Sequence, residues 1–251
     1  MNRWYLYDEL IAGIATDETV REYSVGPSWT YVRTESSIGL AMTQDRPTRP
    51  GVCEKSDLVG MPLGEAAELV KSWHSREAAF GMAAINAFYN SPAQSQEIAV
   101  GSRVETVADV DSFELYRPEL AGKKVAVIGR FPGIEERLDN CELAVIERRP
   151  RRGDYPDSAC EYLLPEADYV FATGSTFVNR TATRLLELGG DAKFVFVGPS
   201  TPLASCLFGH GVFGLCGFVS TDPKSTQLSM RGVGAAKRFG EATMINLRRK
   251  K

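Results

Sequence analysis

Val125-Ala126-Val127-Ile128-Gly129 opens a series of four short apolar runs, each of which stops abruptly at a small or polar residue. The other runs are Leu143-Ala144-Val145-Ile146-Glu147, Tyr169-Val170-Phe171-Ala172-Thr173-Gly174 and Phe194-Val195-Phe196-Val197-Gly198. Continuous apolar runs of this length are typical of parallel strands that are buried on both faces. Ligands of such sheets bind outside the carboxyl ends of the strands. The residues at which the runs stop therefore predict a pocket for a polar small molecule.

The composition is that of an ordinary globular protein. The chain has 251 residues, of which 43% are hydrophobic and 24% are charged, and its net charge at pH 7 is -3. This length allows one large domain or two small ones. The charge offers no broad basic field for nucleic acid, so we expect no nucleic-acid partner.

Nothing in the sequence indicates export or insertion into a membrane. The amino terminus carries Asp8 and Glu9 and lacks the basic and apolar regions of a secretory signal. No apolar run approaches the roughly 20 residues that a membrane span requires. The five cysteines contain no CxxC pair, which favours neither a zinc knuckle nor a disulfide framework. We therefore expect a cytoplasmic protein with no membrane partner, and we leave open that it is a homodimer.

The amino-terminal part of the chain follows a different pattern from the later part. Apolar residues recur at helical spacing over 7–14, and strand-like stretches at 20–25, 29–33 and 38–43 predict a small antiparallel sheet. The prolines of 46–51 predict a loop.

The boundary between the two parts is predicted near residue 95. A helical stretch covers 63–90 and is interrupted just before Ser75, which can cap its second half. The polar segment 91–96 that follows predicts a linker. We therefore expect an α+β domain at 1–95 and an α/β domain at 96–251.

In the second domain strands and helices alternate, which is typical of βαβ units and a mostly parallel sheet. Beyond the four apolar runs, further strands are predicted at 212–219 and 242–247. Helices are predicted at 109–120, 176–188 and 225–239.

The turn after the first apolar run is a candidate binding element, with Gly129 and Phe131 as candidate ligand contacts. It stands where dinucleotide folds carry their glycine-rich turn, but it does not match GxGxxG. Phe131 and Pro132 stand where the backbone would have to approach a pyrophosphate, and Pro132 has no amide hydrogen to donate. We therefore expect no NAD binding. The alternative is a tight turn that merely needs glycine.

Carboxylates follow the second apolar run. Glu147 ends that run where such folds place a ribose-binding acid, or it forms an ion pair with Arg148 or Arg149. Asp154 lies in the next loop, with Tyr155 beside it as a candidate binding residue. Asp154 either caps the following helix or faces the cleft as an acid, a base or a metal ligand.

Two turns rich in glycine and hydroxyl groups follow the third and fourth runs. Gly174-Ser175-Thr176 joins a buried strand to the start of a helix, where free amides attract anions. Asn179 follows one turn later and can reach the same place. Gly198-Pro199-Ser200-Thr201 repeats the arrangement after the next strand. Together the two turns predict an anion site, although Ser175 or Thr176 as a plain helix cap fits the pattern equally well.

Glu77 is a candidate acid or base in the amino-terminal domain. It lies in the first turn of its helix on the apolar face, where a negative charge is also favourable without any function. Motifs of hydrolases, kinases and zinc proteases are absent from the sequence. A bound metal could be held by Glu77, Glu147, Asp154 and hydroxyl groups, which favour hard cations, and its identity stays open.

Segments spread over nearly the whole chain match the motifs of one family. They are Val25-Gly26-Pro27-Ser28-Trp29-Thr30, Ser72-Trp73 with Glu77-Ala78-Ala79, Ala83-Ala84-Ile85-Asn86-Ala87, Val125-Ala126-Val127-Ile128-Gly129-Arg130-Phe131-Pro132, Gly153-Asp154-Tyr155-Pro156, Glu161-Tyr162-Leu163-Leu164-Pro165-Glu166-Ala167-Asp168, Thr173-Gly174-Ser175-Thr176 and Val197-Gly198-Pro199-Ser200-Thr201-Pro202-Leu203. On these segments the chain resembles an uncharacterised prokaryotic family whose name records heavy-metal chelation. The family usually has a histidine where this chain has Arg130. The resemblance implies an amino-terminal domain like that of enolase, a Rossmann-like second domain and a cleft between them.

From these observations we expect the cleft to bind an anionic small molecule or its metal complex. The alternative is an enzyme of cofactor or metal-chelate metabolism, with Glu77 or Asp154 as general acid or base. A third reading, an interaction module, would require a shallow cleft and a large apolar surface patch.

Overall fold

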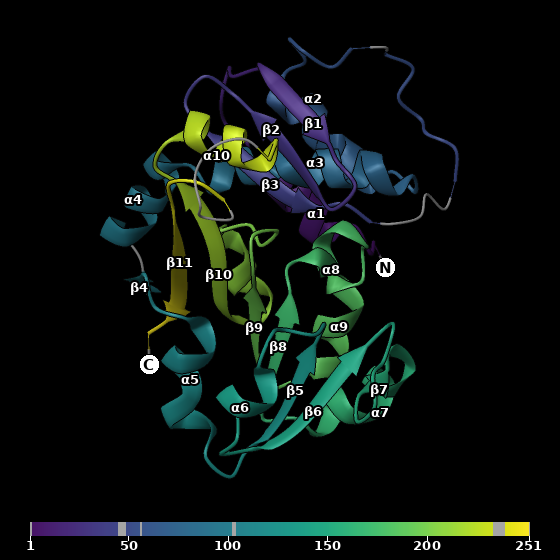
Figure 1. Ribbon diagram of the computed structural model, residues 1–251, viewed down its shortest axis with the longest axis vertical. Helices are drawn as coiled ribbons and strands as arrows, with labels where there is room; N and C mark the ends of the chain where they lie inside the picture. Colours follow the sequence, from purple (N-terminus) through teal and green to yellow (C-terminus); the bar gives the residue numbers. More distant parts are fainter. Residues whose placement is uncertain (1, 45–48, 56, 102–103, 233–238, 251) are drawn as a thin grey trace.

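Two β-sheets, one small and one large, organise the chain (Figure 1). The computed structural model describes residues 2–44, 49–55, 57–101, 104–232 and 239–250. The small sheet has the order β1-β2-β3 and the large sheet has the order β4-β11-β10-β9-β8-β5-β6-β7. The strands are β1 (Glu22–Val25), β2 (Trp29–Arg33), β3 (Ile38–Met42), β4 (Val104–Ala108), β5 (Lys124–Ile128), β6 (Glu142–Glu147), β7 (Tyr155–Pro156), β8 (Tyr169–Thr173), β9 (Lys193–Val197), β10 (Val212–Ser220) and β11 (Ala242–Arg249).

Helices connect these strands and cover the sheets. The α-helices are α1 (Tyr5–Ala12), α2 (Leu63–Glu68), α3 (Ser75–Tyr89), α4 (Pro92–Gly101), α5 (Ser112–Leu120), α6 (Ile134–Arg137), α7 (Cys160–Leu163), α8 (Ser175–Val178), α9 (Ala182–Gly189) and α10 (Pro223–Met230). Short 3-10 helices are η1 (Leu69–Lys71), η2 (Asp157–Ala159), η3 (Leu164–Glu166) and η4 (Ser205–His210). No helix in the described ranges is both long enough and apolar enough to cross a membrane.

The four apolar runs form β5, β6, β8 and β9, which pair in parallel as predicted. Side chains alternate between the two faces of a strand, and in β5, β8 and β9 both faces are largely buried, whereas in β6 only Val145 and Ile146 are buried. On one face, Val127 and Phe171 pack with α5 and α6 through Phe113 and Ile134. On the other face, residues such as Ala172 pack in the core that contains α8 and α9.

The large sheet reverses its strand order between β5 and β8. The chain passes from β5 to β6 on one side and then returns to place β8 on the other side of β5. Such a switch point opens a crevice at the carboxyl ends of the two strands. Here the strands end in Gly129 and Thr173, which touch: a Cβ atom on Gly129 would lie 2.7 Å from Cγ2 of Thr173.

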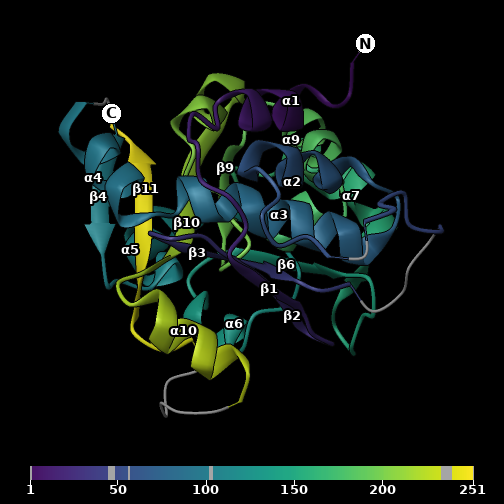
Figure 2. The same cartoon turned by 90° about the horizontal axis from the view of Figure 1, so that it is seen from above.

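The small sheet is antiparallel, as predicted, and lies between α3 and α10 (Figure 2). Gly39 of β3 permits the close approach of α3, since a Cβ atom there would lie 2.1 Å from the carbonyl oxygen of Ala83. On the other face, Tyr31 and Leu40 belong to a core with Phe218 of β10. The small antiparallel sheet beside a large, mostly parallel sheet confirms the predicted fold class.

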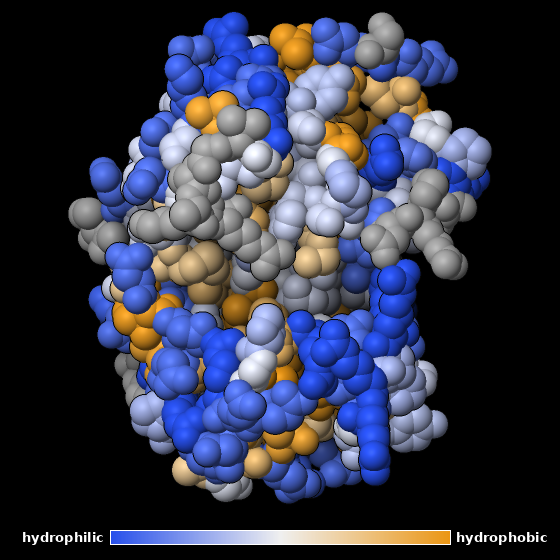
Figure 3. Space-filling model, in the orientation of Figure 1, coloured by the Kyte–Doolittle hydropathy of each residue, from blue (hydrophilic) through white to orange (hydrophobic). Residues whose placement is uncertain are grey.

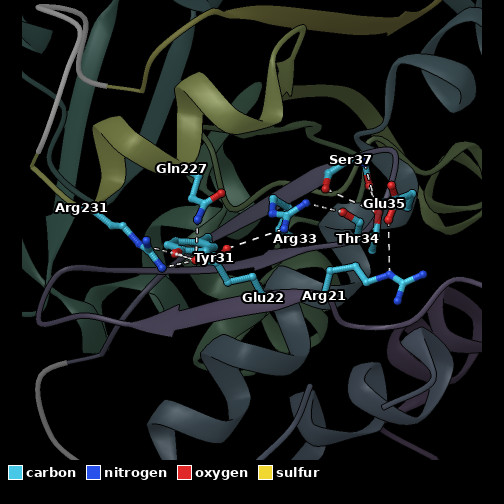
Figure 4. A network of polar contacts seen from close by, with 9 residues as sticks. All are labelled: Arg21, Glu22, Tyr31, Arg33, Thr34, Glu35, Ser37, Gln227 and Arg231. Atoms are coloured by element: carbon cyan, nitrogen blue, oxygen red, sulfur yellow. Dashed lines mark hydrogen bonds and ion pairs between the residues drawn. The ribbon is translucent and has the colours of Figure 1, made fainter. Parts of the chain in front are cut away.

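A polar network joins α10 to the small sheet (Figure 4). The hydroxyl of Tyr31 donates to Glu22 at 3.0 Å and accepts from Nε of Arg231 at 3.0 Å. Gln227 and the guanidinium of Arg231 also contact the Glu22 carboxylate. Burial alone would raise the pKa of Glu22, but these partners hold it below its ordinary value. The network therefore attaches the carboxy-terminal part of the chain to β1 and β2.

Several predictions about single elements are wrong. The segment 91–96 is helical from Pro92, where α4 begins, and α4 crosses the predicted domain boundary. The boundary at 95 itself stays a prediction. The helix predicted at 225–239 ends at Met230, and 233–238 lie outside the described residues, as do 46–48 of the predicted loop.

Two local predictions about helix 176–188 and Ser75 also fail. The sequence predicts one helix at 176–188, but α8 and α9 are separated at Arg180, whose φ is 64°. Ser75 does not cap α3, since its hydroxyl is buried with no partner in the described part of the chain. The hydroxyl of Ser72 accepts the amide of His74 at 3.0 Å instead.

Candidate functional site

A cavity of about 740 Å³ lies at the carboxyl ends of the parallel strands. Figure 1 shows β5, β6 and β8 pointing toward the small sheet, which supplies Trp29 and Met42 to the cavity wall. The face drawn in Figure 3 is hollowed at mid-height, between the parts that carry the two sheets. The cavity thus lies where the switch point between β5 and β8 meets the small sheet.

Most of the predicted binding residues line this cavity. They are Gly129, Phe131, Glu147, Ser175, Thr176, Asn179, Gly198, Pro199 and Ser200. Their positions follow from the topology, because the carboxyl ends of parallel strands meet at one edge of the sheet.

The other predicted site residues lie outside the lining. Gly174 and Thr201 stand behind it and pack against each other. Asp154 and Tyr155 belong to the loop and short strand beside β6. Glu77 lies on α3 and contacts a different loop. The structure therefore brings the two turns after β8 and β9 together but does not bring Glu77 to them.

In two polar side chains of the cavity wall, the oxygen atom accepts hydrogen bonds from the protein, while the O–H or NH₂ group has no acceptor there. Oγ1 of Thr173 accepts the amide and the hydroxyl of Ser175 at 3.4 and 3.3 Å. The side-chain oxygen of Asn179 accepts the amide and the hydroxyl of Thr181 at 3.1 and 2.6 Å. Because an amide N–H can only donate, it fixes the Asn179 oxygen toward Thr181. The O–H of Thr173 and the NH₂ of Asn179 have no acceptor in the described ranges.

Ser200 also has an O–H group without an acceptor, although its oxygen accepts one hydrogen bond and not two. Its Oγ accepts the amide of Met42 at 2.8 Å, which also ties the end of β3 to the turn after β9. The remaining O–H has no acceptor within the residues that the structure describes. Thr176 is different, since its hydroxyl already donates to the carbonyl of Thr173 at 2.8 Å.

Two of the four backbone amides predicted for the anion site, those of Ser175 and Thr201, donate within the protein. The amide of Ser175 donates to Thr173, and the amide of Thr201 donates to the carbonyl of Gly198 at 2.9 Å. Helix α8 has only four residues, so its end carries little of a helix dipole. Side-chain donors therefore stand beside the remaining amides of Thr176 and Ser200 in this cavity.

Glu147 holds the backbone of two turns. Its carboxylate accepts the amide of Arg130 at 2.9 Å and the amides of Arg148 and Arg149 at 2.7 and 3.3 Å. The predicted partners Arg148 and Arg149 thus reach it through their backbones. With three amides bound, this carboxylate has little capacity left for ribose hydroxyls.

The positive charge of Arg130 is compensated. Its guanidinium contacts the carboxylates of Asp154 and Glu135. Asp154 also accepts the amide of Arg151 at 2.8 Å, and its side chain is only 2% exposed. Asp154 is therefore not a helix cap, and it reaches the cavity only through Arg130.

Two further arginines line the cavity, and the sequence prediction did not include them. Arg184 is paired with Glu161 and Glu187. Arg148 is exposed, and its guanidinium has no ion-pair partner among the described residues. It is therefore the available positive charge at this part of the wall.

The residues present do not fit a cage for a bare metal ion. Within the described ranges, no group of three or more His, Cys, Asp or Glu side chains is placed to hold one. Cys160 lines the cavity, but burial raises the pKa of its thiol to about 11, which disfavours the thiolate that metals bind. The Glu147 carboxylate already accepts hydrogen bonds from backbone amides, and the Glu161 carboxylate already forms an ion pair with Arg184.

Glu77 anchors a loop. Its carboxylate accepts the amides of Val52 and Cys53 at 2.9 Å, and it also accepts the hydroxyl of Ser72. Burial raises the pKa of Glu77, but these hydrogen bonds outweigh it and hold the pKa below its ordinary value. An ionised, saturated carboxylate is a poor general acid. Its catalytic role stays a prediction.

Sequence reasoning missed the apolar wall of the cavity. Trp29, Met42 and Phe239 come from β2, β3 and the segment after α10, and the rings of Trp29 and Phe239 lie 5.0 Å apart. The one available signal was the family segment that contains Trp29. The meeting of these three residues is a product of tertiary structure.

Comparisons with known proteins agree with this fold. Family models described as "Putative heavy-metal chelation" match residues 7–89 and 111–248. A crystal structure of a protein of unknown function from Desulfitobacterium hafniense is 37% identical with a TM-score of 0.88, covering 98% of each chain. An uncharacterised protein of Methanocaldococcus jannaschii is 30% identical over 213 residues, which are 78% of this chain and 76% of the relative.

A second crystal structure shows the fold alone. This protein of unknown function from Pyrococcus horikoshii is 23% identical with a TM-score of 0.82, and the match covers 99% of this chain and all of that chain (100%). Together with the two family matches, these likenesses extend over both sheets. The chain therefore belongs to the family described as putative heavy-metal chelation.

Proposed function

We propose that the cavity binds an anionic small molecule, either free or as its complex with a metal ion. The observation that carries the proposal is the surplus of donors. The side-chain oxygens of Thr173 and Asn179 each accept two hydrogen bonds from the protein and that of Ser200 accepts one, while all three side chains keep N–H or O–H groups at the cavity. Donors without an acceptor in the protein favour a ligand that accepts hydrogen bonds, such as a carboxylate or a phosphate.

The unpaired guanidinium of Arg148 supports the same ligand chemistry. Arginine matches the geometry of carboxylate and phosphate groups, and the nearby positive charge of Arg130 is already compensated. The apolar side chains Trp29, Met42 and Phe239 on the opposite wall would exclude water from the bound anion. Hydrogen bonds strengthen when water is excluded.

A metal would enter this cavity as cargo that the anion itself chelates. This form agrees with the family description and with the lack of a cage for a bare ion in the described part of the chain. The alternative of acid–base catalysis by Glu77 or Asp154 has less support. Both carboxylates accept backbone amides and lie outside the cavity lining.

Calorimetry with phosphate and with citrate, each with and without Ni²⁺, tests the proposal. We expect binding by the wild type and a loss of at least about tenfold in Asn179→Asp, which replaces two donors by a negative charge. Gln96→Glu is the matched control, because it adds the same charge at an exposed position of α4. Absence of binding, or equal losses in both variants, would refute the proposal. Tighter binding of Ni²⁺ alone than of Ni²⁺ with citrate would refute the cargo form.

A further inference from the structure

Arg180 has a backbone conformation that arginine rarely adopts. Its φ is 64°, and Asp109 is the other non-glycine residue with positive φ in the described ranges. This conformation costs free energy in residues that have a Cβ atom, and it persists only where the surroundings impose it. At Arg180 it breaks the helical stretch into α8 and α9.

The side chain of Arg180 explains what imposes the break. Its Nη1 donates to the carbonyl of Ser72 at 2.8 Å and to that of Val178 at 3.1 Å. The guanidinium lies over the ring of Trp73, 4.9 Å from the centroid, and this ring packs against Trp4 at 5.8 Å. Residues Ser72 and Trp73, in the turn before α3, therefore hold the Arg180 side chain through a hydrogen bond and a cation–π contact.

The burial of Arg180 is incompletely compensated. Its Nε is buried and has no hydrogen-bond partner among the described residues, and burial holds the pKa of the guanidinium below its ordinary value. A buried donor without an acceptor is unfavourable, and such groups in native proteins call for an explanation. Two unfavourable features thus coincide at one residue.

The residues on either side of Arg180 give that explanation. Asn179 and Thr181 both line the cavity, and Thr181 holds the Asn179 oxygen so that the NH₂ group stays available. A continuous helix would turn these two side chains to different directions, since successive helical residues point about 100° apart. The break at Arg180 lets both face the cavity.

We propose that Arg180 is a positioning residue: gripped by Ser72 and Trp73, it holds the α8–α9 break so that Asn179 presents its donors to the bound anion. The inference rests on the proposed function and adds to it a control of the anion site by the amino-terminal part of the chain. Arg180 itself lies outside the cavity lining and acts through Asn179.

A double-mutant cycle with inorganic phosphate as the probe tests this coupling. The variants are Arg180→Gly, Asn179→Ala and the double variant, measured by calorimetry. Glycine adopts a positive φ without strain. Arg180→Gly therefore removes the side-chain contacts with Ser72 and Trp73 but still allows the same backbone conformation. We expect Arg180→Gly to weaken phosphate binding by roughly tenfold, the scale of one charged hydrogen bond. In the Asn179→Ala background the same change should alter affinity by less than about twofold.

Asp109→Gly is the matched control, because it relieves the same kind of backbone strain outside the cavity and should leave the affinity unchanged. Losses that multiply in the double variant, an unchanged affinity in Arg180→Gly, or an equal loss in Asp109→Gly would each overturn the inference. If Arg180→Gly does not fold, Trp73→Leu replaces it with the same expected coupling to Asn179. If Asn179→Ala binds phosphate like the wild type, it is the proposed function that fails.

Discussion

Gly174 and Thr201 are in such close contact that no side chain fits between them. A Cβ atom on Gly174 would lie 2.5 Å from both the amide nitrogen and Oγ1 of Thr201. The contact joins the turn after β8 to the turn after β9, directly behind the cavity wall. Glycine at 174 is therefore required by packing, since its φ is an ordinary -56°.

We expect Gly174→Ala to lower the free energy of unfolding by about 1–3 kcal/mol, because backbone atoms of Thr201 would have to move. Urea denaturation measures the change. Gly64→Ala is the control: it places a Cβ atom within α2, where nothing lies within 4 Å. This control should be neutral or slightly stabilising. Equal stability of Gly174→Ala and the wild type would contradict the packing argument.

The two carboxylates that contact Arg130 should differ in their contribution to stability. The side chain of Asp154 is 2% exposed, whereas that of Glu135 is 53% exposed. Removing one partner of a buried pair costs about 3 kcal/mol or more, and removing an exposed partner costs about 1 kcal/mol or less. We therefore expect Asp154→Asn to be far more destabilising than Glu135→Gln in thermal or urea unfolding. The reverse order would show that burial does not govern this cluster.

Stability should depend on pH through Glu77. Its pKa in the folded protein is lowered below the ordinary value of 4.5, so the ionised form stabilises the fold. This contribution is fully present above the unfolded pKa of about 4.5 and is lost as the pH falls through the lower folded pKa. At pH 7 we expect Glu77→Gln to cost about 1–2 kcal/mol, because the new NH₂ group faces backbone donors.

Urea denaturation of wild type and Glu77→Gln between pH 7 and pH 3 checks this dependence, and the difference should shrink toward the acid end. Phosphate titration of the same variants separates the two roles of this residue. Unchanged affinity in Glu77→Gln assigns the carboxylate to loop anchoring, whereas a tenfold loss would support its predicted role at the ligand.

NAD and NADP should not bind tightly. The amide of Arg130, which a pyrophosphate would need, donates to Glu147 at 2.9 Å, and Pro132 has no amide hydrogen. The same contact occupies the carboxylate that a ribose would need. We expect calorimetry to give dissociation constants of about 1 mM or weaker, that is, about 4 kcal/mol or less of binding free energy. A micromolar constant would show that the turn rearranges.

The parallel strands, and the edge of the sheet at which their carboxyl ends meet, follow from the sequence alone. Val125 to Ile128 and the three similar runs are apolar on both faces, so burial between two layers of helices is their favourable state. The ends of such strands must share one edge, and Gly129, Ser175 and Ser200 therefore line one cavity, as predicted.

Long-range contacts set the features that these local patterns leave open, namely where a helix is interrupted and which partner a side chain contacts. Residues 176–188 have helical periodicity, but the helix is interrupted at Arg180, whose side chain contacts Ser72 and Trp73. No local signal encodes a contact across more than 100 positions. The local sequence around Glu77 predicts a carboxylate that faces the cleft, but this carboxylate accepts hydrogen bonds from the amides of Val52 and Cys53. Local periodicity reports which side of an element is buried. The partner on that side is chosen by long-range packing, and here the packing decided which polar atoms remain free for a ligand.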